Sequence, residues 1–149
     1  MDECNIIRLN NLISYISPTE NPLSANVVMI QGREALWLYD VGNHPDIPQV
    51  IEQFRDGRNV NVILSHFHED HIGNLPGMGV DEVYQGKYTH RHTDMGTVVE
   101  DDIYIQDGDV SLSHIYTAFK PCKGLCCVGS KTRVVLSWRC IICNAEMRT

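Results

Sequence analysis

The stretch that decides the fold is Ser65-His66-Phe67-His68-Glu69-Asp70-His71-Ile72-Gly73-Asn74-Leu75, which begins at the end of an apolar run. Residues 59–65, Asn-Val-Asn-Val-Ile-Leu-Ser, predict a buried strand. Three histidines and one aspartate then fall within six residues, at His66, His68, Asp70 and His71. Zinc takes such ligands at neutral pH, and open α/β sheets place their sites just beyond a strand end. We therefore expect a metal site here.

The residues around this stretch predict a mixed α/β architecture. Upstream, residues 25–30 and 35–40 predict a hairpin with a turn at 31–34, and residues 45–55 predict a helix. Downstream, residues 82–85 predict a short strand. Two more strands are expected between 101 and 113, with a turn at 107–109. Strand, helix and strand in that order indicate the α/β (α+β) class.

Length and composition exclude several functional classes. The 149 residues suit one domain, and the 43% apolar and 21% charged fractions are ordinary for a folded chain. No apolar run has the length of a membrane span, and the N-terminal residues do not form a signal peptide pattern. The net charge of −7 argues against nucleic acid and anionic membranes as partners. We expect a cytoplasmic protein.

The quoted stretch resembles the H-x-H-x-D-H signature of the metallo-β-lactamase superfamily. Asp40-Val41-Gly42 resembles the first motif of that family, and the order of the elements agrees over residues 6 to about 116. The resemblance implies an αββα sandwich, in which two β-sheets pack together with helices outside both. It also implies a hydrolase.

The resemblance further implies a role for each motif residue. His66 and His68 would hold one zinc ion, and Asp70 and His71 would hold a second. Asp40 would orient ligands by hydrogen bonding. A metal-bound hydroxide would attack an ester, thioester, amide or phosphodiester of a small-molecule substrate, and Asp70 would also act catalytically by orienting the nucleophile or passing a proton.

The C-terminal part departs from the family pattern. The family completes its sites with two later histidines and a bridging aspartate, but this sequence has no histidine after His114 and no aspartate after Asp109. Each zinc ion would then have only two of its ligands. We therefore expect residues 1–116 to form the N-terminal half of the domain, the second half to be incomplete and the chain as written to be inactive.

A shift of the reading frame after Tyr116 accounts for residues 117–149. Displaced by one nucleotide, the codons of residues 117–124 can encode Leu-Pro-Ser-Ser-His-Ala-Lys-Gly, and those of 136–144 can encode Phe-Leu-Gly-Asp-Ala-Leu-Tyr-Ala. The same shift thus supplies a histidine and an aspartate in the family's order. An out-of-frame tail would leave the first sheet partly uncovered, and self-association through that sheet would follow.

Two other interpretations of the sequence remain open. The cysteines of the tail offer thiolates for a structural zinc site, which would make the chain a non-enzymatic zinc-binding module; they are Cys122, Cys126, Cys127, Cys140 and Cys143. Alternatively, a partner chain would supply the missing ligands. The isolated histidines are interpreted as surface or hydrogen-bonded core residues rather than ligands; they are His44, His90, His92 and His114.

Overall fold

The computed structural model describes residues 1–65, 67–99, 103–114, 125–129 and 133–136. Seven strands form the first sheet, in the order β1-β2-β5-β6-β7-β8-β9. They are β1 (Ile6–Arg8), β2 (Ile13–Ile16), β5 (Val27–Gln31), β6 (Ala35–Tyr39), β7 (Asn59–Ile63), β8 (Glu82–Gln85) and β9 (Thr97–Val98). Strands β1, β2, β5 and β6 are successively antiparallel, whereas β6, β7, β8 and β9 run parallel.

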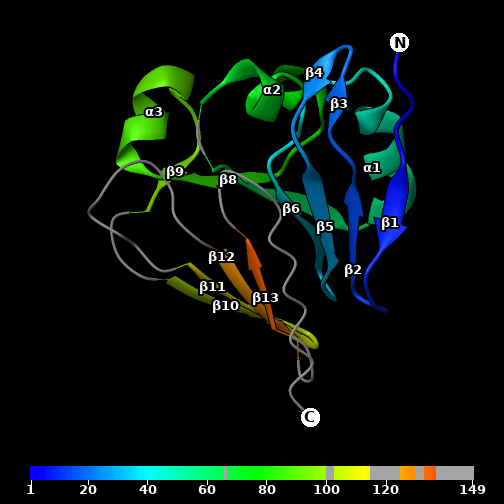
Figure 1. The fold of residues 1–149 in the computed structure, drawn as a ribbon. Coiled ribbons are helices and arrows are strands. Elements are labelled where there is room, and N and C mark those ends of the chain that lie inside the picture. The colour runs from blue at the N-terminus through cyan, green and yellow to red at the C-terminus, as the bar shows by residue number, and fades with distance from the viewer. Residues whose placement is uncertain (66, 100–102, 115–124, 130–132, 137–149) are drawn as a thin grey trace.

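A second sheet and a small hairpin complete the β-structure (Figure 1). The second sheet is antiparallel and consists of β10 (Ile103–Asp107), β11 (Val110–His114), β12 (Leu125–Gly129) and β13 (Arg133–Leu136). Strands β3 (Thr19–Glu20) and β4 (Leu23–Ser24) form the hairpin. The helices are α1 (Ile47–Arg55), α2 (Glu69–Ile72), the 3₁₀ turn η1 (Leu75–Gly77) and α3 (Lys87–Thr93).

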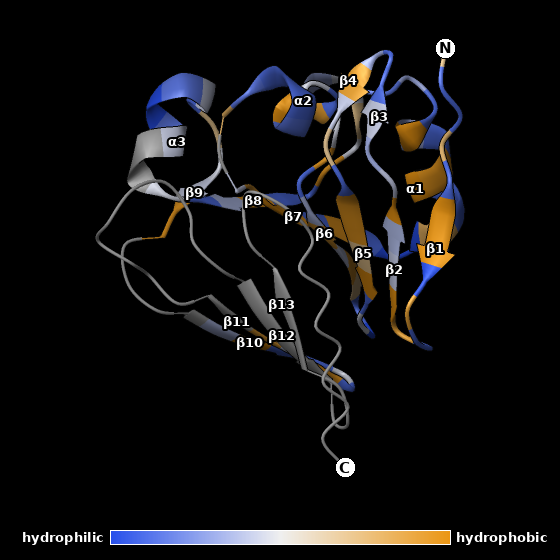
Figure 2. Ribbon diagram, in the orientation of Figure 1, coloured by the Kyte–Doolittle hydropathy of each residue, from blue (hydrophilic) through white to orange (hydrophobic). Residues whose placement is uncertain are grey.

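Both faces of the first sheet are covered, which explains why its central strands are apolar without alternation. On one face, Met29 and Leu38 pack with Ile47 and Ile51 of α1 and with Leu75 of η1. The other face contributes a second buried cluster, whose members in the first sheet include Ile30 and Trp37 and whose members in the second sheet are Val110 and Leu112. The molecule is therefore a sandwich of two sheets with helix α1 outside the first (Figure 2).

A buried carboxylate joins the two sheets. Asp107, at the β10–β11 turn, is 7% exposed and accepts hydrogen bonds from the backbone N–H groups of Arg33, Glu34 and Ala35 at 2.8–3.1 Å. It also accepts one from Nε1 of Trp37 at 3.0 Å. The β5–β6 turn thus surrounds the carboxylate with donors, and the pairing fixes the second sheet against the first.

The elements predicted from the sequence are present, with differences. The structure contains the predicted hairpin as β5–β6, the predicted helix at 45–55 as α1 and the predicted strand at 59–65 as β7. The later predicted strands are β8, β10 and β11. Strands β12 and β13 come from residues 117–149 and extend the second sheet from β11. In the described part of the chain all the helices precede β10, so the helix expected outside the second sheet is not among them.

Among the residues that the structure describes, no helix has the length and apolar character needed to cross a bilayer.

Candidate metal centre

The candidate site lies where three parallel strands of the first sheet end. Tyr39 pairs with Ile63, and Ile63 pairs with Tyr84, so the carboxyl ends of β6, β7 and β8 reach the same edge. Asp40 follows β6 at once, Ser65 follows β7 by two residues, and α3 begins two residues after β8. Because parallel strands end together, residues far apart in the sequence meet at this edge.

Asp40 is held by the end of β7 and by its own strained backbone. Its side chain is buried, and Oδ1 accepts the backbone N–H of Ser65 at 2.7 Å, while Oδ2 accepts the Ser65 hydroxyl at 2.6 Å. The backbone of Asp40 has φ 60°, a left-handed conformation that aspartate and asparagine tolerate better than most residues. This conformation turns the chain sharply out of β6, and the hydrogen bonds from Ser65 hold the carboxylate in place.

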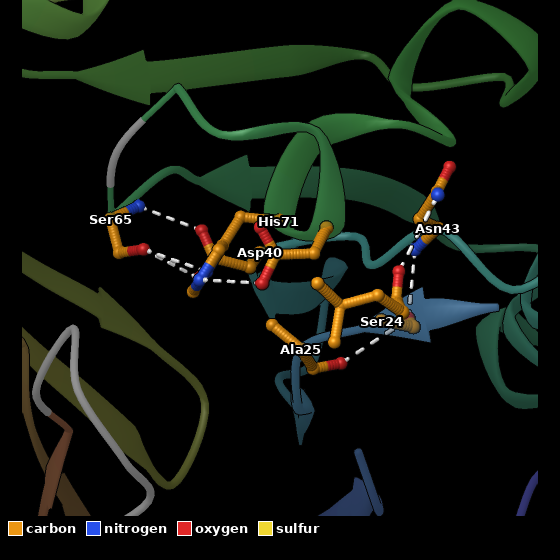
Figure 3. Close-up of polar contacts among 8 residues, drawn as sticks. Ser24, Ala25, Asp40, Asn43, Ser65 and His71 are labelled. Carbon is orange, nitrogen blue, oxygen red and sulfur yellow. Dashed lines mark hydrogen bonds and ion pairs between the residues drawn. The ribbon is translucent and has the colours of Figure 1, made fainter. Parts of the chain in front are cut away.

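His71 completes this group from α2, as Figure 3 shows. Its Nδ1–H donates to Oδ2 of Asp40 at 2.7 Å, and Nδ1 also lies 3.3 Å from the Ser65 hydroxyl. The Asp40 contact fixes the tautomer that leaves Nε2 with a lone pair. That Nε2 lies 3.5 Å from Oδ2 of Asp70. Burial lowers the pKa of His71, but the hydrogen bond to Asp40 and the negative charges of Asp40 and Asp70 outweigh it and raise that pKa above its ordinary value.

The backbone of α2 is fixed by two neighbouring segments. Ala25, after the β3–β4 hairpin, donates its N–H to the carbonyl of Asp70 at 2.8 Å. Val41 and Gly42 donate theirs to the carbonyl of His71 at 2.9 and 3.1 Å. The turn that carries Asp70 and His71 is therefore positioned by main-chain bonds as well as by Asp40.

One expectation about local structure was wrong. A site just beyond a strand end is expected on a loop, whereas Asp70 and His71 lie in the short helix α2 and His68 is its N-cap residue. The N–H groups of His71 and Gly73 donate to the carbonyls of His68 and Glu69, at 2.9 and 2.8 Å, and close a helical turn. This turn places Asp70 and His71 side by side.

The donors present suit a metal ion in part. Two ligands bound at about 2.1 Å in tetrahedral geometry lie about 3.4 Å apart, and His71 Nε2 and Asp70 Oδ2 are separated by a similar distance, 3.5 Å. These two side chains therefore fit one zinc ion. His66 lies outside the described residues, and within the described ranges no three histidine, cysteine, aspartate or glutamate side chains group closely enough to hold a metal.

The other histidines differ from one another in their surroundings. His44 is fully buried, its Nδ1 accepts the backbone N–H of Asp46 at 3.1 Å, and its Nε2–H donates to the carbonyl of Asp2 at 2.6 Å. It is a hydrogen-bonded core residue, as interpreted from the sequence. His92 on α3 stacks on Phe67 of the H-x-H-x-D-H stretch, a contact that no sequence signal indicated beyond the His90–His92 spacing.

Three of the five tail cysteines, Cys122, Cys140 and Cys143, lie outside the described residues, and the other two belong to β12. The zinc module built from this set stays a prediction.

Comparison with known proteins finds a family that matches part of the chain. The sequence model of the metallo-beta-lactamase superfamily matches residues 21–79, which contain both the Asp40 motif and the H-x-H-x-D-H stretch. Over these residues the chain is similar to the metallo-β-lactamase superfamily. Among curated relatives, ribonuclease Z of Limosilactobacillus reuteri is 30% identical over 70 residues, which is 47% of this chain and 23% of that protein. Human "Zinc phosphodiesterase ELAC protein 1" is 31% identical over 65 residues, which is 44% of this chain and 17% of that protein.

Solved structures of the superfamily share the fold. A metallo-β-lactamase of Cronobacter sakazakii with a HARLDQ motif superposes with a TM-score of 0.66 at 16% identity, covering 84% of this chain and 55% of that one. The subclass B3 enzyme BJP-1 of Bradyrhizobium japonicum gives 0.64 at 16% identity, covering 89% and 61%. The chain thus spans less than two thirds of these proteins and under a quarter of the two curated relatives.

Proposed function

We propose that this chain carries the metal-binding half of a zinc-dependent hydrolase that acts on phosphodiesters. One observation carries the proposal: Asp40 orients His71 so that its Nε2 faces Asp70 at the edge where β6, β7 and β8 end. The names of the two curated relatives, a ribonuclease and a zinc phosphodiesterase, favour the phosphodiester over the ester, thioester and amide.

Each residue of the stretch has a place in this proposal. His66 and His68 hold one zinc ion, and Asp70 and His71 hold the second. Bound zinc supplies positive charge that polarises the phosphoryl group and lowers the pKa of a water molecule. Asp40 keeps the His71 ring in one tautomer and orientation, and Ser65 keeps Asp40 in place. Asp70, with an oxygen beside the site, accepts the proton of the attacking water.

Charge narrows the substrate further. At a net charge of −7 the chain would repel a long polyanion, since non-specific binding of nucleic acid relies on Lys and Arg contacts to phosphate. We therefore propose a small-molecule phosphodiester, with no nucleic acid or membrane partner and in the cytoplasm. The exposed edge strand β1, with Ile6 and Ile7 40–44% exposed, would support self-association.

The proposal includes low activity for the sequence as written. Residues 1–116 contain the first ligands of each zinc ion, and the sequence holds no later histidine or aspartate to complete them. Two ligands without the remaining donors bind a zinc ion weakly. The turnover rate would therefore fall well below that of a complete site.

The test is a zinc titration of the purified chain by calorimetry, combined with hydrolysis of bis(p-nitrophenyl) phosphate. We expect zinc binding that weakens in His68→Ala and His71→Ala but not in the control His90→Ala. Equal binding by all variants would contradict the metal site. Hydrolysis at ordinary enzymatic rates would contradict the low activity, and loss of zinc binding on replacing Cys140 and Cys143 would favour the cysteine module.

A further inference from the structure

The residue between the first two histidines of the metal stretch makes two ring contacts. Phe67 stacks face to face on His92, with ring centroids 3.7 Å apart and planes inclined by 12°. It also lies edge-on to the imidazole of His68, with centroids 5.1 Å apart at 85°. The edge-on arrangement with His68 is a favourable geometry for aromatic rings, and the close stack with His92 brings the two ring faces into contact. Phe67 therefore connects a predicted zinc ligand to a side chain from another element.

The position of His92 is itself fixed by the sheet. It lies in the last turn of α3, next to Thr93, whose hydroxyl donates to Oε1 of Gln85 at 2.7 Å. Gln85 is the last residue of β8 and is only 2% exposed, and its Nε2 donates to the carbonyl of Met95. A buried amide at the strand end thus holds the chain just after His92, at Thr93 and Met95.

The ligand residues between β7 and α2 are held in place by different contacts. His71 and Asp70 are fixed by Asp40 and by main-chain bonds from Ala25, Val41 and Gly42. The side chain of His68 precedes that helical turn, at its N-cap position with extended backbone. The Phe67 ring packs against it from the side that α3 covers.

We propose that His92 is a positioning residue for the metal site: stacked on Phe67, it holds the Phe67 ring against His68 and so fixes the orientation of that ligand. The proposal rests on the proposed zinc site. It adds that helix α3, which Gln85 of β8 holds in place, supports the ligand His68 of that site. A ligand held in its binding orientation before the ion arrives loses less rotamer freedom on binding, and the affinity rises accordingly.

The experiment compares three substitutions in the full chain. His92→Ala removes the stacking ring, His92→Phe keeps an aromatic ring, and His90→Ala changes a neighbouring histidine of the same helix. Zinc affinity is measured by calorimetric titration of the metal alone. We expect His92→Ala to weaken zinc binding by about tenfold, in the range that supporting residues of metal ligands show. We expect His92→Phe to restore most of it and His90→Ala to leave it unchanged.

A second readout does not depend on metal. In the metal-free chain the NMR chemical shifts of the His68 ring are sensitive to the nearby Phe67 ring. These chemical shifts should change in His92→Ala, be close to those of the unmodified chain in His92→Phe, and be unchanged in His90→Ala. Absence of zinc binding by the unmodified chain would contradict the proposed function, while these shifts would still support the positioning contact. Unchanged His68 signals in His92→Ala, or equal loss of affinity in His90→Ala, would overturn the inference.

Discussion

The Nδ1–H of His71 donates to Oδ2 of Asp40 at 2.7 Å, across 31 residues of sequence. The same carboxylate accepts two hydrogen bonds from Ser65. In each of these three hydrogen bonds Asp40 is the acceptor. The geometry requires an ionised, acceptor-only side chain at position 40.

Asp40→Asn tests this requirement. Asparagine tolerates the φ of 60° but presents an NH₂ group to a donor, and it removes the charge beside His71. We expect zinc affinity to fall about 10- to 100-fold, measured by titration of the metal-free chain. Asp56→Asn is the matched control, because Asp56 is an exposed aspartate with φ 47°. An equal loss in both variants would contradict a specific role for Asp40.

Two glycines with similar backbones should respond differently to a side chain. Gly42 has φ 64°, and an added Cβ would lie 2.6 Å from both Cδ1 of Ile47 and Oγ of Ser24. Gly57 has φ 75° with no atom within 4 Å of such a Cβ. We expect Gly57→Ala to cost about 1–2 kcal/mol of unfolding free energy from strain alone, and Gly42→Ala to cost about 1–3 kcal/mol more from overpacking. Urea denaturation of both variants measures the difference, and equal costs would contradict the tight packing at Gly42.

Asp107 should make stability depend on pH in the acid range. Burial raises the pKa of this carboxyl, but the hydrogen bonds from Glu34, Trp37, Ala35 and Arg33 outweigh it and lower the pKa below the ordinary value. A lowered pKa in the folded state means that the stabilisation is fully present above the pKa of the unfolded chain, near 4. It is lost as the pH falls through the folded value.

The variant Asp107→Asn should therefore be less stable than the unmodified chain at pH 7, by about 1–3 kcal/mol. The gap should narrow when urea denaturation is repeated near pH 3. Asp109→Asn, an exposed aspartate of the same turn, is the control and should change little. A gap that persists at low pH would show that the charge of Asp107 is not what joins the sheets.

The sequence signals for the candidate site are local. The apolar run at 59–65 and the close spacing of His68, Asp70 and His71 predict a metal-ligand set at a strand end. The supporting contacts are not local: Asp40 to Ser65, Asp107 to the β5–β6 turn and His92 to Phe67 each join residues 25 or more positions apart. The packing of separate segments brings those pairs together, and hydrophobic periodicity does not determine which segments pack against each other. Helices α2 and α3 were missed since each is too short to show helical periodicity.

The reading frame after Tyr116 gives the last prediction. We expect the coding DNA from codon 110 onward to contain, one nucleotide out of frame, a histidine codon across Pro121/Cys122 and an aspartate codon across Arg139/Cys140, followed by a further histidine. The chain translated from that frame would gain the donors that each zinc ion lacks here. It should bind two zinc ions per chain by elemental analysis and hydrolyse bis(p-nitrophenyl) phosphate, while the sequence as written binds fewer and hydrolyses it slowly. Stop codons in the shifted frame, or absence of those residues, would instead make the cysteines of residues 117–149 genuine and direct the search for zinc to them.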